Sequence, residues 1–265
     1  MWNDIRTLNT ITRAMLSVLV LCLLYGGYKW LARQPMFDFR VVQVRAMKGA
    51  SLRYVDAVTV RSAALPRIRG NFFTADLQAV RAAFETVPWV QRASVRREWP
   101  NKLVVTVEEY KVLGTWGEEG RLISADGFVF TANLAEAEAE VEGKLPELAG
   151  PDDSAHEVAA RLADLRNWLA PLRLTPRSLS LSQRYAWTAR LNNGVTLHLG
   201  RAAERDVLKA RIDRFVSVYP QLSLAMSGQI SSVDLRYPNG LALRQRGQST
   251  SVTVPAPVTD AESAT

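Results

Sequence analysis

The residues of this chain whose type and spacing most suggest a catalytic or metal-binding site are glutamates. Four glutamates stand at alternate positions from Glu136 to Glu142, and paired carboxylates can bind a cation or act as a general acid and base. They lie in a low-complexity segment, residues 132–144, in which nothing would hold or desolvate them. We therefore predict that this segment is a solvated surface excursion without a metal or catalytic site.

Histidine and cysteine are too few for other common kinds of site. The sequence has two histidines, His156 and His198, and a single cysteine, Cys22, inside an apolar N-terminal run. This excludes a multi-histidine metal centre and an internal disulfide. His156 falls in the first turn of a predicted helix, and His198 faces away from the leucines of its strand, so we interpret both as surface residues. We predict no catalytic residue, no metal and no cofactor.

The motifs that hold phosphates or activate a serine are also missing. The sequence contains no G-x-x-x-x-G-K-[ST], G-x-G-x-x-G, G-x-S-x-G or H-E-x-x-H. The formal net charge is +7, but the basic residues are scattered and form no arm with interleaved aromatics. This distribution indicates a solvated basic surface and not a nucleic-acid site. The residue types thus favour a binding protein over an enzyme.

The first predicted element is a hydrophobic segment near the N-terminus, which would anchor the following domains. Residues 14–28 carry no charge, and Lys29 can snorkel, so the apolar helix extends to about residue 32. The alternative is a cleaved signal peptide, but Trp30 fits an A-x-A cleavage site poorly. We predict a short cytoplasmic tail at 1–13 and an uncleaved transmembrane helix at 14–32. Basic residues flank the helix on both sides, so charge alone does not orient it.

A small α+β domain is predicted at residues 36–108. We expect a strand at 39–47, a helix at 51–65, and a second helix that Thr74 caps and Pro88 ends. Two strands with period-two alternation follow, and Pro100-Asn101 forms the turn between them. The order β-α-α-β-β predicts a small sheet with two helices on one face.

Phrases in this hairpin resemble a known family. Pro88-Trp89-Val90, the segment S-V-R-R-E-W-P at 94–100 and the segment V-E-E-Y at 107–110 closely resemble the POTRA domain of the FtsQ/DivIB family of bacterial cell-division proteins. Two later segments, L-G-R-A-A-E-R-D from Leu199 and I-S-S-V-D-L-R-Y-P-N-G from Ile230, resemble the second domain of that family. The resemblance covers nearly all of residues 36–246, in order.

A second domain is predicted at residues 111–247, with mixed α/β structure and an extended, mostly antiparallel sheet. Ser154 and Glu157 have the spacing of a capping box at the start of one helix, and residues 203–219 predict another. A final hairpin turns at Pro238-Asn239-Gly240. Residues 248–265 are rich in Ser, Thr, Pro and Ala, and we predict a disordered tail.

The final hairpin is the predicted binding site. Its return strand, residues 241–246, is expected at a sheet edge, where unpaired backbone groups can accept a strand from a partner. The resemblance implies that FtsB, together with FtsL, binds there, with Arg236 and Tyr237 in the family's D-L-R-Y phrase. The residues that we assign to partner binding are Arg236, Tyr237, Asn239, Gly240, Leu241 and Leu243. Because Tyr237 shares its parity with Val233 and Leu235, a place in the core is an equal alternative.

The resemblance also implies a function and a location. It implies an inner-membrane scaffold of the division septum, with a cytoplasmic N-terminus and a periplasmic body, that links early and late divisome proteins. The POTRA domain would contact other divisome proteins, and no nucleic acid or small-molecule substrate is expected. One alternative is a POTRA protein that handles other polypeptides, although such proteins usually carry several POTRA repeats or a barrel. A second alternative is a membrane-anchored periplasmic hydrolase.

Overall fold

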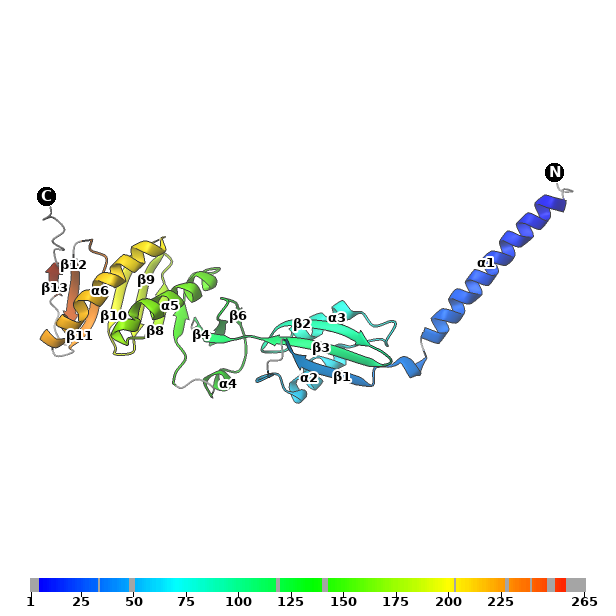
Figure 1. Cartoon of the computed structure of the whole chain (residues 1–265), viewed down its shortest axis with the longest axis horizontal. Coiled ribbons are helices and arrows are strands. Elements are labelled where there is room, and N and C mark those ends of the chain that lie inside the picture. Colours follow the sequence, from blue (N-terminus) through cyan, green and yellow to red (C-terminus); the bar gives the residue numbers. More distant parts are fainter. Residues whose placement is uncertain are drawn as a thin grey trace, which may run out of the picture. The chain divides into compact units, whose positions relative to one another are not determined.

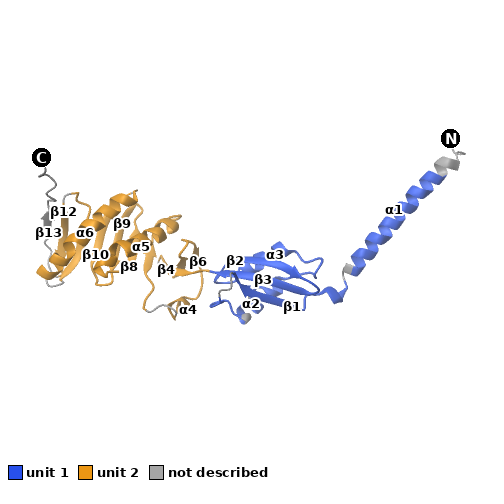
Figure 2. Cartoon of the chain, viewed as in Figure 1, with its two compact units in different colours: residues 1–109 blue, residues 110–265 orange. Residues whose placement is uncertain are grey.

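The computed structural model describes residues 5–32, 34–47, 51–117, 120–139, 143–202, 204–226, 229–238, 240–246 and 251–255. The chain divides into two compact units, residues 1–109 and 110–265 (Figures 1 and 2). The boundary falls between Glu109 and Tyr110, in the short interval between the two domains that the sequence predicts.

A long N-terminal helix, α1 (Ile5–Ala32), opens the chain. Its stretch Asn9–Leu31 is 23 residues long and apolar enough to cross a membrane. The helix begins nine residues before the predicted start at residue 14, and so it includes most of the predicted tail at 1–13. The reason is that the polar residues before Ala14 end the apolar run but remain compatible with helical backbone.

A three-stranded sheet forms the body of the first unit. Its strands are β1 (Val41–Ala46), β2 (Val90–Glu98) and β3 (Lys102–Glu109), in the order β1-β3-β2. β1 runs parallel to β3, and β2 runs antiparallel to it. Val41, where the chain enters the sheet, pairs with Lys102 beside the β2–β3 turn. Short 3-10 helices lie at Pro35–Phe37 (η1) and Leu65–Arg67 (η3).

The two helices of this unit are α2 (Ala57–Ala63) and α3 (Leu77–Glu85), and each has an aspartate as its N-cap. Asp76, and not Thr74, caps α3, because its carboxylate accepts the N–H groups of Gln78 and Ala79. α2 is much shorter than the predicted 51–65. Residues 53–55 instead donate their N–H groups to the carboxylate of Glu109, at the end of β3. This contact spans more than fifty residues, so no local pattern predicts it.

A ten-stranded mixed sheet forms the second unit within the described residues. In sheet order its strands are β13 (Ser251–Pro255), β12 (Gly240–Gln245), β11 (Ile230–Asp234), β10 (Thr196–Arg201), β9 (Ala186–Leu191), β8 (Pro176–Leu181), β7 (Glu147–Ala149), β4 (Val112–Trp116), β5 (Arg121–Ser124) and β6 (Val129–Phe130). Three neighbouring pairs are parallel, namely β10–β11, β7–β8 and β4–β7, and the others are antiparallel. The predicted α+β class is confirmed.

Helices α5 (Ala155–Leu169) and α6 (Arg205–Ala225) cover one face of this sheet (Figure 1). The short helices α4 (Leu134–Ala139) and η4 (Ala170–Leu172) complete the unit. α6 continues past the predicted end at Tyr219 and includes Pro220. The proline removes only one backbone hydrogen-bond donor, and the other hydrogen bonds of the helix maintain it. Ser154 is the N-cap of α5, but its hydroxyl donates to the carbonyl of Pro151, so the predicted capping box does not form.

The core of the second unit lies between the helices and the sheet. Alternate strand residues such as Trp187, Ala189 and Leu197 point into it and are buried, while Thr188 and His198 face the other side. The helices contribute the buried residues Leu162, Leu165, Leu169, Leu208, Ile212 and Phe215. One face of the sheet is therefore apolar and covered, and the other is polar and open to solvent.

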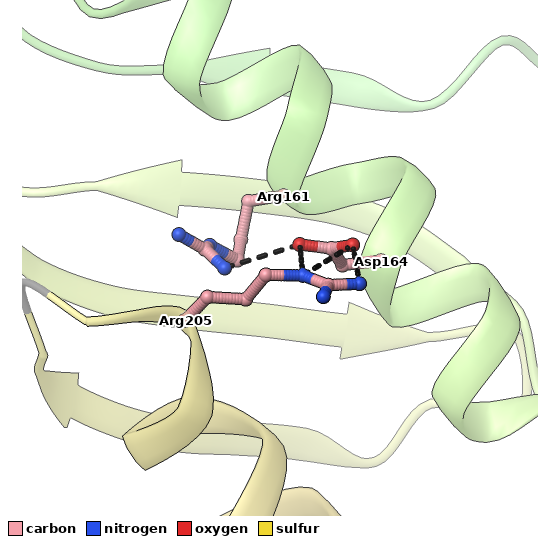
Figure 3. A network of polar contacts seen from close by, with 3 residues as sticks. All are labelled: Arg161, Asp164 and Arg205. Carbon is pink, nitrogen blue, oxygen red and sulfur yellow. Dashed lines mark hydrogen bonds and ion pairs between the residues drawn. The ribbon is translucent and has the colours of Figure 1, made fainter.

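A charged network joins the two helices (Figure 3). The Asp164 carboxylate of α5 accepts a hydrogen bond from Arg161 at 3.1 Å. Nε and Nη2 of Arg205 also donate hydrogen bonds to this carboxylate at 2.8–3.0 Å. Arg161 is buried, with its guanidinium over the ring of Trp187, whereas Arg205 is mostly exposed. The network therefore combines one buried and one exposed ion pair.

The C-terminal segment corrects one prediction. Residues 251–255 form strand β13, which pairs antiparallel with β12 from Gly240↔Pro255 to Arg244↔Ser251. The predicted disorder of the tail is therefore wrong for these five residues, and the remainder of 248–265 lies outside the described residues. Alternating Val and Thr suit a strand, but only a neighbouring edge can supply the hydrogen bonds that make it one.

Candidate partner-binding site

The β11–β12 hairpin is held in place from two sides. β11 ends at Asp234, and the next residue, Leu235, donates its N–H to the carbonyl of His198 on β10 at 2.9 Å. From α6, Nη1 of Arg214 donates to the carbonyl of Tyr237 at 2.8 Å. The segment after β11 is thus fixed by the neighbouring strand and by the helix, so the side chains it carries have defined positions.

Arg236 is fixed by an intramolecular pair with Asp234. Its Nε and Nη2 donate to the Asp234 carboxylate at 2.5–3.0 Å, and its backbone N–H donates to Oδ1 at 3.0 Å. The acid that Arg236 contacts is therefore in its own chain. The arginine side chain is still 63% exposed, which leaves donors available to a second carboxylate.

Gly200 lies beneath the stem of Arg236. It has a φ of +72° and sits at a bulge in the β9–β10 register. A Cβ at this position would come within 2.6 Å of Cγ of Arg236, so a larger residue would displace that side chain. Sequence reasoning missed this residue, although a glycine inside the strand pattern L-H-L-G-R is a signal for a bulge or a close approach.

The charge of Arg236 stabilises the ionised form of Asp234. Partial burial raises the pKa of Asp234, but the side-chain and backbone hydrogen bonds from Arg236, together with its charge, outweigh burial, so the pKa lies below its ordinary value of 3.8. A depressed carboxyl pKa stabilises the fold at pH values above the unfolded pKa, and this stabilisation is lost as the pH falls through the folded pKa. The pair therefore persists throughout the neutral range.

Replacing Asp234 with asparagine should lower the free energy of unfolding at pH 7 by up to about 1 kcal/mol, because Arg236 is largely solvated. The difference between the wild type and the variant should shrink as the pH falls below 3.8 and the wild-type carboxyl takes up a proton. Urea unfolding of both proteins at neutral and acid pH would measure this. An equal difference at both pH values would contradict an ionic role for Asp234.

A shallow hollow of about 340 Å³ lies on the open face of the sheet, beside this pair. Its polar lining comes from β9, β10, β11 and β12 and includes Thr188, His198, Ser232, Asp234, Arg236, Tyr237 and Arg244. Basic and hydroxyl groups dominate this lining, so the hollow suits an acidic or hydrogen-bonding side chain of a partner.

The residues that the sequence assigns to partner binding fall into two groups. Arg236 and Tyr237 are exposed, and Tyr237 is 51% exposed because the chain leaves the sheet after Asp234 and breaks the alternation that would have buried it. Leu241 and Leu243 are each 1% exposed, so their side chains belong to the core and only their backbone could meet a partner. Gly240 is buried at the start of β12, and Asn239 lies outside the described residues.

The expected sheet edge is not at β12. Ala242 pairs with Asp234 of β11 on one side and with Thr253 of β13 on the other, so the backbone of β12 is occupied on both sides. The prediction that strand 241–246 is the outer strand is therefore corrected, and β13 takes that position. An added partner strand would have to replace β13 or pair with its outer side.

The fold and the site define a class of protein. A helix long and apolar enough to cross a membrane, a small three-stranded α+β body and a larger mixed-sheet domain describe a two-domain α+β protein with an N-terminal apolar helix. Residues 43–110 match the family model "POTRA domain, FtsQ-type", and residues 114–236 match "Cell division protein FtsQ/DivIB, C-terminal".

Full-length relatives agree with these domain matches. The chain is 46% identical over 247 residues to cell division protein FtsQ of Burkholderia pseudomallei, which covers 93% of this chain and 95% of the relative. It is 40% identical over 255 residues to cell division protein FtsQ of Bordetella pertussis, which covers 92% of each chain. The chain belongs to the FtsQ/DivIB family of cell division proteins, which are non-enzymatic components of the divisome.

Proposed function

We propose that this protein is an inner-membrane scaffold of the division septum that binds FtsB together with FtsL through the β11–β12 hairpin. The observation that carries the proposal is the exposed pair Arg236 and Tyr237, fixed by Asp234 and Arg214 beside the hollow. A rigid aromatic and an arginine with free donors are the residue types that dominate the energetics of protein interfaces. In this proposal the partner supplies an acidic side chain and a segment that follows the strand edge.

The remaining parts of the proposal concern topology and the first unit. The N-terminus would lie in the cytoplasm, and the POTRA domain and the second unit would lie in the periplasm, so that the links between early and late divisome proteins form outside the cytoplasm. The POTRA domain at residues 36–108 would contact other divisome proteins. The FtsQ family membership of the chain and the one membrane-length helix among its described residues support this arrangement.

The test of the proposal is binding of the full chain, held in lipid nanodiscs, to the extracytoplasmic parts of FtsB and FtsL from the same organism. Saturable binding to FtsB, strengthened when FtsL is also present, is the expected result. If the chain does not bind FtsB even when FtsL is present, the proposal is wrong. Peptidoglycan cleavage by the purified chain would instead favour a hydrolase.

Deletion of residues 248–265 should raise the affinity for FtsB, because a partner strand that adds to β12 must first displace β13. A tail that occupies the edge nine-tenths of the time would weaken binding roughly tenfold, since only the open fraction is competent to bind. Titration of the deletion variant and the wild type with the same FtsB segment would measure the ratio. A weaker affinity after deletion would mean that the partner pairs with β13 itself.

A further inference from the structure

An aromatic cluster lies at the end of the first unit where the chain arrives from α1. Its rings come from three separate segments: Phe37 of η1, Phe72 and Phe73 of the loop before α3, and Trp99 of the β2–β3 turn. Their centroids are close, at 4.9 Å for Phe37–Phe73, 5.3 Å for Phe72–Phe73 and 5.5 Å for Phe72–Trp99. Together with Met36, which precedes Phe37, we call these residues the aromatic end.

The backbone holds the aromatic end in one arrangement. The N–H of Phe72 donates to the carbonyl of Phe37 at 2.9 Å, and the N–H of Arg40 donates to the carbonyl of Asn101 at 3.1 Å. The carboxamide oxygen of Asn71 accepts the N–H of Phe73 at 3.1 Å. The segments that carry the aromatic rings are therefore held together by hydrogen bonds, and the cluster has a defined surface.

Much of this surface is apolar and faces solvent. Trp99 is 65% exposed, Met36 63% and Phe73 42%. Single exposed apolar residues are ordinary. Here Phe73 and Trp99 are joined through the ring contacts of Phe37 and Phe72, and Met36 precedes Phe37 in the chain, so the exposed residues form a patch of the kind that marks an interaction site.

The covalent chain identifies what this patch can reach. The apolar span of α1 ends at Leu31, and Met36 follows five residues later. Five residues extend over at most about 18 Å, and the headgroup layer on each side of a bilayer is about 5–8 Å thick. The turn from Leu31 to Gln34, closed by a 3.1 Å hydrogen bond, shortens this reach further. The aromatic end is therefore tethered at the membrane surface on the side where α1 ends.

Residue type and charge favour contact with lipid at this surface. Tryptophan and other amphipathic aromatic residues prefer the headgroup region, where a ring meets both apolar and wet surroundings. The acidic residues Asp38 and Glu98 lie beside the same end as the basic residues Arg40 and Lys102, so its charge is mixed. Apolar insertion, and not attraction to anionic lipid, must then supply most of the contact.

We propose that the aromatic end is a membrane-docking surface, with Met36, Phe73 and Trp99 inserted in the headgroup layer of the bilayer that α1 crosses. The contact fixes which end of the POTRA body faces the membrane and so limits the orientations that a five-residue tether would otherwise allow. It requires no partner protein and does not depend on where FtsB binds.

Site-directed spin labelling of the full chain tests this proposal. Cys22 is replaced by alanine, and single cysteines are placed at Phe73, Trp99 or Val58. Val58 is the matched control, because it is 73% exposed and lies in α2, three residues after Val55. The N–H of Val55 donates to the carboxylate of Glu109 at the far end of β3. The eight residues of β3 separate the two ends by about 23 Å. Each protein is reconstituted in phosphatidylcholine vesicles with or without phosphatidylglycerol.

Labels at positions 73 and 99 should lose collisions with a water-soluble nickel reagent and gain collisions with oxygen in both lipids, while the label at 58 stays accessible to water. Equal nickel accessibility at 58, 73 and 99 would overturn the proposal. Protection that occurs only with phosphatidylglycerol would also overturn it, because charge would then hold the domain.

A second measurement guards against a label that disturbs the fold. Lipids brominated near the headgroup quench tryptophan fluorescence, and Trp99→Phe keeps an aromatic ring while removing one fluorophore. The quenched fraction should fall in the variant, since Trp99 contributes to it in the wild type. An unchanged or larger quenched fraction would place Trp99 in water and reject the insertion.

Discussion

Replacing Asp164 with alanine should lower the free energy of unfolding of the second unit by about 3–5 kcal/mol, because the change leaves a buried guanidinium without its counter-charge. Arg161 is 8% exposed, and its Nη1 lies 3.1 Å from the Asp164 carboxylate (Figure 3). Its Nε is buried and has no hydrogen-bond partner among the described residues. The ring of Trp187, 5.7 Å from the guanidinium carbon, cannot replace a carboxylate. Urea unfolding followed by tryptophan fluorescence would measure the loss.

Arg205 provides the matched control for Asp164, because it bonds to the same carboxylate but is 59% exposed. Arg205→Ala should lower the free energy of unfolding far less than Asp164→Ala does, as expected for a solvated ion pair. The double substitution Arg161→Met with Asp164→Leu should recover most of the loss, since apolar residues of similar volume can replace a buried ion pair. If Asp164→Ala cost no more than Arg205→Ala, then water must reach Arg161 and the network would be a surface feature.

Tyr237→Ala should weaken binding of FtsB with FtsL by at least about 30-fold, which corresponds to the roughly 2 kcal/mol expected of an interface hot spot. The tyrosine ring is half exposed, and its position is fixed through the carbonyl that Arg214 holds. Little conformational freedom would therefore be lost when a partner covers it. Arg236→Glu should have an effect of similar size, because it places a second acid beside Asp234 where the partner is expected to bring a carboxylate. Both variants would be titrated in nanodiscs beside the wild type.

Two exposed residues outside the hollow serve as controls for these variants. Phe128→Ala removes an aromatic side chain that is 57% exposed elsewhere in the second unit. Arg190→Glu reverses the charge of an exposed residue of β9 that does not line the hollow. Both should bind like the wild type. Binding that survives Tyr237→Ala and Arg236→Glu would retain the FtsB interaction but move its site away from the hairpin. Circular dichroism of every variant would show that the fold is intact.

Features that depend on a local pattern of residues could be predicted from the sequence alone. Period-two alternation predicted the two strands on either side of Pro100-Asn101, because successive side chains of a strand point to opposite sides. An uncharged run predicted the membrane-length helix, and the phrases around Trp99 and Asp234 predicted the family. The same phrase assigned Arg236 and Tyr237 to the binding site through the family resemblance, but it left a core position for Tyr237 equally open, and only the structure shows that Tyr237 is exposed.

Contacts between distant segments could be learned only from the folded structure. Several features depend on neighbours that are distant or ambiguous in the sequence. These are the pairing of β13 with β12, the burial of Leu241 and Leu243, and the packing of the Arg236 side chain against Gly200. The Glu109 carboxylate that ties down residues 53–55 is a further case. A periodic pattern specifies which side of a strand is apolar, but strand order, register and long-range polar partners are set by packing of the whole sheet.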